Sequence, residues 1–231
     1  REPPRGLDDV EGEKPVRGLG DGLAWVKGRF ATYLGLVSLA CVMTIIAYGQ
    51  GGWNASLFER NWGWAPERFA TVNGLINLLV GPLAVLAAGR WADAWSKRVP
   101  DAPLRVLLVG ALVMIPCAAA APLMPTATLG FVFLALATAG IGMVSAVGVL
   151  SVLEITPAAV RGQVVALYYM AISLSGLFLG PPVVGWLSDH VFGPQQLRWA
   201  VATLPLLFGA LPLLLASRTR ALYLEALARQ K

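Results

Sequence analysis

Five long stretches of this chain contain no Asp, Glu, Lys or Arg, and this feature constrains its fold more than any other. They cover residues 30–58, 69–89, 106–153, 162–188 and 199–217. A helix that crosses a membrane needs about 20 consecutive apolar residues. Backbone polar groups in lipid must bond within the protein, so only helices and closed barrels span a membrane. Because the stretches lack the period-2 alternation of barrel strands, the sequence predicts an all-α membrane protein.

The stretch at 106–153 is long enough for two crossings, and Pro122 and Pro125 bracket a turn within it. Six membrane helices are therefore expected, at 30–52, 69–92, 104–122, 127–154, 158–187 and 198–217. They would form one bundle over 30–217. We expect residues 1–29 to be a cytoplasmic segment and residues 218–231 a cytoplasmic tail. Because residue 1 is Arg, we also expect the chain to be part of a longer protein.

Composition excludes several classes of protein. Hydrophobic residues make up 57% of the chain and charged residues 13%, about half the share of about 25% in soluble domains. Such a chain meets a lipid bilayer, and we expect no nucleic-acid partner. It has one His, no phosphate-binding glycine loop and no nucleophile–base set. We therefore expect no metal, no cofactor and no enzymatic activity, and a membrane-embedded enzyme is the weaker alternative.

Basic residues predict the orientation of the chain. If six helices place both termini on one side, 15 Lys and Arg residues lie on that side and 3 on the other. Loops rich in Lys and Arg remain in the cytoplasm. We therefore expect both termini to be cytoplasmic, in a multi-pass protein of the cell (inner) membrane.

Three segments resemble loop signatures of the major facilitator superfamily. The second expected helix ends in Gly89-Arg-Trp-Ala-Asp93, followed by Lys97-Arg98, which is similar to the signature after the eighth helix of these transporters. Residues 154–163 resemble the loop between helices ten and eleven, and residues 180–189 resemble the eleventh helix and its exit. The family's Gly-Arg-Arg ending is not intact, because Ser96 precedes Lys97.

A finer likeness is to the bacterial spinster-like branch of that superfamily. It involves residues 53–60, 161–167, 179–181, 189–193 and 197–200. If this likeness holds, it implies a lipid or an organic anion as substrate.

The resemblance implies the C-terminal half of a twelve-helix transporter, built as two inverted three-helix repeats. Such a protein moves a small-molecule substrate by alternating access, and the substrate binds between this half and the N-terminal six-helix half. The Gly-x₃-Asp spacing of Gly89 and Asp93 recurs in Gly185 and Asp189, as inverted repeats predict. A non-transporting scaffold or a regulatory partner is the main alternative.

Polar residues within the expected helices are candidates for a substrate cavity. Asn73 and Asn77 are four residues apart and share a helix face, which favours either bonds between helices or contact with substrate. The glycines at 49, 51 and 52 would allow the first helix to bend, and those at 176 and 180 would allow close packing. The full set of cavity candidates is Tyr48, Gln50, Asn73, Asn77, Tyr168 and Tyr169. For Tyr168 and Tyr169, packing or anchoring at the membrane interface is the alternative.

A second group of residues is expected to form a cytoplasmic gate. Thr156 followed by Pro157 predicts the cap and first turn of the fifth helix. Family resemblance places Asp93 near that start, so Asp93, Glu154 and Arg161 are predicted to form a charged cluster when the transporter faces outward. The complete gate set is Gly89, Asp93, Lys97, Arg98, Glu154 and Arg161.

Overall fold

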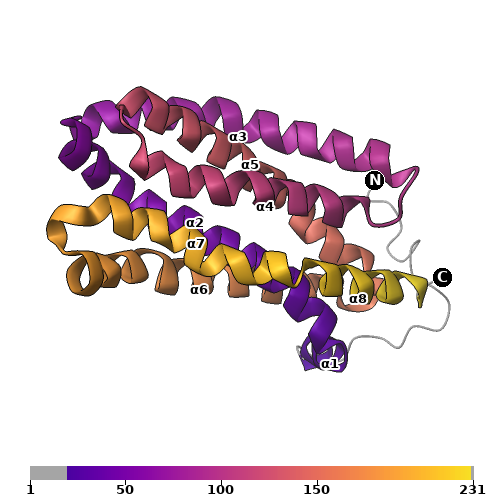
Figure 1. The fold of residues 1–231 in the computed structure, drawn as a ribbon. Helices are drawn as coiled ribbons and strands as arrows, with labels where there is room; N and C mark the ends of the chain where they lie inside the picture. The colour runs from indigo at the N-terminus through magenta and orange to yellow at the C-terminus, as the bar shows by residue number, and fades with distance from the viewer. Residues whose placement is uncertain (1–19, 230–231) are drawn as a thin grey trace, which may run out of the picture.

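The computed structural model describes residues 20–229. Across that range the long elements are all helices, which confirms the predicted all-α fold (Figure 1). Six helices within this range are long and apolar enough to cross a membrane, as predicted. The helices are α1 (Gly20–Gly28), α2 (Phe30–Trp62), α3 (Pro66–Ser96), α4 (Ala102–Ala120), α5 (Ala127–Glu154), α6 (Arg161–Leu187), α7 (Leu197–Leu214) and α8 (Ala216–Ala228). The first 19 residues of the predicted cytoplasmic segment, and its four basic residues there, lie outside the described range.

The first membrane helix differs from its predicted form. We expected it to end at residue 52, but α2 continues to Trp62 and is capped by Gly63, which has a φ of 64°. The glycine at 49 allows close packing, because a Cβ there would lie 3.1 Å from the carbonyl oxygen of Gly180. The uncharged stretch at 30–58 does not fix the end of the helix, because α2 continues through Glu59 and Arg60.

Close approaches between helices are concentrated at glycines. A Cβ on Gly180 would lie 2.7 Å from both the amide nitrogen of Gly49 and the carbonyl oxygen of Ile45 in α2. A Cβ on Gly140 of α5 would lie 2.7 Å from the carbonyl oxygen of Gly110 in α4. Small residues let backbones meet closely in membrane bundles. The packing role predicted for the glycine at 180 is thereby confirmed.

The six membrane helices pack in a reciprocal pattern. The first helix of one half of the chain, α2, packs on α6 and α7, while the corresponding helix of the other half, α5, packs on α3 and α4. Figure 1 shows these as two groups, α3–α4–α5 above α2–α6–α7. Each three-helix repeat thus places its first helix among the other repeat's second and third helices, as two inverted repeats predict.

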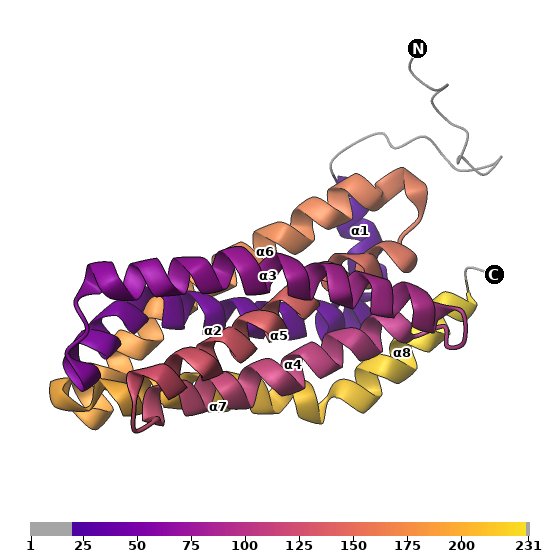
Figure 2. The same ribbon diagram turned by 90° about the horizontal axis from the view of Figure 1, so that it is seen from above.

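Two shorter helices lie at the same end of the bundle (Figure 2). The α1 helix is tied to α6 by a 2.7 Å hydrogen bond from the backbone N–H of Gly22 to Oε1 of Gln163. The α8 helix, which occupies most of the predicted tail, buries Tyr223 completely and places Thr219 against Gly35 of α2. We call this end the α1/α8 end.

Candidate functional site

A polar cavity lies among α2, α3, α4 and α5, with a volume of about 130 Å³. Four carboxamide side chains line it, those of Gln50 and Asn54 from α2 and those of Asn73 and Asn77 from α3. The other lining residues are Ala47, Gly51, Met114, Leu134, Ala137, Thr138 and Ile141. The structure thus brings together three of the six predicted cavity candidates and adds Asn54, which sequence reasoning missed.

Helical spacing explains how the four carboxamides converge. Gln50 and Asn54 are four residues apart on α2, and Asn73 and Asn77 are four apart on α3, so each pair projects from one face of its helix. Gln50 is held in place by a 2.6 Å hydrogen bond from its Nε2 to the carbonyl oxygen of Ala118 in α4. The four-residue spacing from Gln50 is the sequence signal that could have identified Asn54.

The asparagines of the cavity lack hydrogen-bond partners within the described part of the chain. Asn54 is only 6% exposed, and its Oδ1 has no partner there. Asn73 is half-buried and Asn77 exposed, and no hydrogen bond within residues 20–229 involves either side chain. An unsatisfied buried polar group costs about 1–3 kcal/mol. The cavity is therefore equipped to bond a group that the described residues do not supply.

The three predicted tyrosines lie outside this cavity. Tyr48 is exposed and its ring adjoins Gly176. Tyr168 is buried with its hydroxyl beside Gly148, and it lines a separate apolar pocket of about 260 Å³ near α1. Tyr169 is 50% exposed and contacts the Tyr168 ring edge-on, with centroids 5.3 Å apart. For Tyr168, these contacts favour the packing alternative.

The predicted gate residues do not form one cluster in this structure. Glu154 accepts a hydrogen bond from the Tyr223 hydroxyl of α8, and Arg161 donates through Nε to the carbonyl oxygen of Thr156 at 3.0 Å. Asp93 is exposed and joins neither residue in an ion pair within residues 20–229. Gly89 has open space at its Cβ position, and Lys97 and Arg98 are exposed. The outward-facing latch of these residues stays a prediction.

The prediction that Thr156 caps the fifth membrane helix was wrong. Thr156 does not cap it, because its hydroxyl donates back to the carbonyl oxygen of Val152 at 2.6 Å and shares a 2.8 Å hydrogen bond with the Tyr33 hydroxyl. A single turn at Ala158–Val160 follows, and α6 begins at Arg161. A long-range partner on α2 therefore overrides the local capping preference of Thr156.

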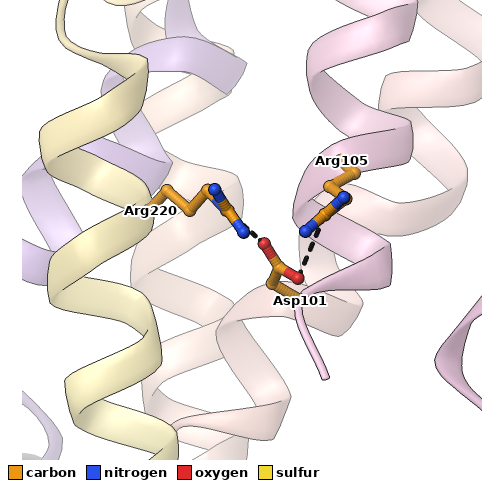
Figure 3. Close-up of polar contacts among 3 residues, drawn as sticks. All are labelled: Asp101, Arg105 and Arg220. Atoms are coloured by element: carbon orange, nitrogen blue, oxygen red, sulfur yellow. Dashed lines mark hydrogen bonds and ion pairs between the residues drawn. The ribbon is translucent and has the colours of Figure 1, made fainter. Parts of the chain in front are cut away.

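A different charged cluster ties the α1/α8 end together, and Figure 3 shows it. Asp101, in the loop before α4, is 1% exposed and accepts hydrogen bonds from Arg105 at 3.1 Å and from Arg220 of α8. Burial opposes ionisation of Asp101, but the hydrogen bonds from Arg220 and Arg105 outweigh it and lower its pKa. The spacing of Asp101 and Arg105 is visible in the sequence, whereas Arg220 is 119 residues away.

Comparison with known proteins identifies the architecture. No family model and no curated protein sequence matches the chain. Two solved structures of a bacterial homologue of the human lysosomal transporter Spinster do match, both inward-facing, one unoccupied and one occupied. Their TM-scores are 0.65 and 0.64, each at 20% identity, over 99% and 93% of this chain. The chain therefore has the fold of about half of the matched transporter chain.

The chain spans only 54% and 52% of the two matched chains. Its polar cavity, of about 130 Å³, is also smaller than the about 300–1,000 Å³ of most ligand pockets. By itself, the cavity is therefore smaller than a typical ligand-binding site.

Proposed function

We propose that this chain is the C-terminal half of a secondary transporter that carries a small molecule across the cell (inner) membrane by alternating access. Its partner would be the N-terminal six-helix half of the same transporter, and both termini would face the cytoplasm. The observation that supports this proposal most strongly is the group of unpaired carboxamides at the polar cavity.

Unpaired amides in membrane helices require a partner. Asn77 is exposed on α3. Only 6% of the most apolar segment of this membrane helix is buried against the other helices. Lipid cannot bond an amide, and polar side chains within membrane spans accordingly face protein or a water-filled cavity. The face of α3 that carries Asn73 and Asn77 is therefore best satisfied by water and substrate between two halves.

The gate proposal concerns the α1/α8 end. Asp93 and Arg161 lie at ends of α3 and α6 and carry no ion pair to each other here. The matched transporter structures are inward-facing. We therefore propose that Asp93 approaches Arg161 and Glu154 only when this end closes, with Gly89, Lys97 and Arg98 at the closing surface.

Two-sided labelling of the cavity tests alternating access without knowledge of the substrate. In the complete transporter that contains this chain, Cys41 and Cys117 are replaced by alanine and one cysteine is placed at Thr138, which lines the cavity. A membrane-impermeant methanethiosulfonate is applied to intact cells and to inside-out vesicles. We expect Thr138→Cys to react from both sides. Leu136→Cys, also on α5 but outside the cavity lining and 44% exposed, is the control and should react from neither.

The outcome separates the transporter from the scaffold. A static scaffold exposes a given position to at most one side of the membrane. Reaction of Thr138→Cys from one side alone, or from neither, would therefore contradict alternating access.

A further inference from the structure

We infer that the group of the substrate bound by this half is an uncharged, hydroxyl-bearing group, held by the carboxamides of the polar cavity. This inference rests on the proposed function and deepens it by naming the chemical class of the group that the polar cavity recognises. It also limits the organic-anion class implied by the sequence likeness: any anionic group of the substrate must bind elsewhere.

The buried acceptor on Asn54 indicates a hydrogen-bond donor on the ligand. Its Oδ1 is enclosed and has no partner within the described residues. A carboxylate carries negative charge and no proton at neutral pH, so it cannot donate a hydrogen bond to this oxygen. A hydroxyl donates one hydrogen bond and accepts two, so it can satisfy Asn54 and also accept from neighbouring amides.

The lining that the structure describes contains no counter-charge. Besides the four carboxamides and Thr138, the lining residues are a glycine and apolar side chains. A buried anion is stabilised best by a cation, and a buried ammonium by a carboxylate or an aromatic face. Neither a charged nor an aromatic side chain lines this cavity among the described residues.

The cavity also limits the size of the recognised group. Its volume of about 130 Å³ is below that of most ligand pockets, so it accommodates only a small part of a substrate. Gln50 is already fixed by its bond to Ala118, so the site is partly organised before the ligand enters. A short polyol segment fits these limits.

Three matched probes test the inference: glycerol, glycerate and 3-amino-1,2-propanediol, which share a three-carbon backbone and differ in the charge of one end. The measurement is the rate at which neutral methyl methanethiosulfonate modifies the Thr138→Cys transporter. We expect glycerol to slow modification and the two charged probes to slow it less. Asn54→Leu should weaken protection by glycerol about tenfold, because one hydrogen bond to an otherwise orphaned acceptor is lost.

Asn61→Leu is the matched control, because Asn61 also lies on α2 but bonds to the carbonyl oxygen of Pro122 outside the cavity. Protection by glycerol should be unchanged in this variant. Equal or stronger protection by a charged probe, or no protection by glycerol, would overturn the inference. If Thr138→Cys still reacts from both sides, that result leaves the transport proposal intact. Reaction from one side at most would instead refute transport itself.

Discussion

Replacement of Asp101 by Asn should release α8 from the bundle. Asp101 is almost fully buried and accepts from Arg105 on α4 and from Arg220 on α8 (Figure 3). The substitution keeps the size of the side chain and one acceptor oxygen, but it removes the charge and replaces one acceptor with a donor. Two guanidinium groups would then face an uncharged amide.

The structure sets the size of this effect between two limits. A hydrogen bond to a charged group contributes about 1.5–3 kcal/mol, whereas an exposed ion pair contributes about 0.2–1 kcal/mol. Arg105 and Arg220 are 33% and 44% exposed, so solvent screens both of them in part. We therefore expect the docking of α8 to weaken by about 2 kcal/mol, closer to the charged limit because Asp101 itself is buried. Tyr223 should keep part of the helix associated.

Limited proteolysis measures this docking. Trypsin cuts after Arg218 once α8 opens, and in the fast-opening regime the cleavage rate follows the population of the open form. A loss of about 2 kcal/mol corresponds to about thirtyfold faster cleavage. Glu225→Gln is the matched control, because it also removes one negative charge. Glu225 lies on α8 and has no ion pair within the described range. A rate for Asp101→Asn no faster than that of Glu225→Gln would refute the reasoning.

Acid should reduce the difference in stability between the native protein and the Asp101→Asn variant. Because the folded-state pKa of Asp101 is lowered, its contribution to stability is fully present above the unfolded value of about 3.9 and is lost as pH falls through the folded value. The gap in melting temperature between the native protein and Asp101→Asn should therefore narrow below pH of about 4. A gap that stays constant with pH would show that the charge of Asp101 does not stabilise the fold.

Three further predictions concern packing, α8 and topology. Gly180→Ala should destabilise the fold by about 1–3 kcal/mol in thermal unfolding, because the added Cβ would meet the α2 backbone. Gly81→Ala is the control and should not destabilise the fold, because the space around Gly81 is open. Equal effects of the two substitutions would contradict this packing. Tyr223→Phe should lower the free energy of unfolding by about 1 kcal/mol, because it removes the hydrogen bond to Glu154. Burial and this bond raise the pKa of Tyr223, so the native protein should lose that stability as pH rises above about 10. An unchanged melting temperature of the variant would refute the role of the bond. A cysteine at Ser96 should label from the cytoplasm and one at Ser56 from outside, and the reverse result would overturn the orientation.

The amino-acid sequence by itself determined the helical membrane fold and part of the candidate site. An uncharged stretch of about 20 residues can satisfy its backbone in lipid only as a helix or in a barrel, so each crossing is decided locally. Gln50, Asn73 and Asn77 were also identifiable, because carboxamides are conspicuous in such stretches. The glycines at 176 and 180 indicated close packing before any partner helix was known.

Only the tertiary structure decided which polar groups find partners. Thr156 has the local chemistry of a helix cap, yet the Tyr33 hydroxyl of α2 engages it and α6 begins later. Asp101 meets Arg220 because α8 continues past α7 and lies beside the loop before α4, and Asn54 is left unpaired because no described neighbour reaches its oxygen. The physical reason is that a helix needs only its own residues and the surrounding lipid, whereas a hydrogen bond between distant residues depends on how all the helices pack.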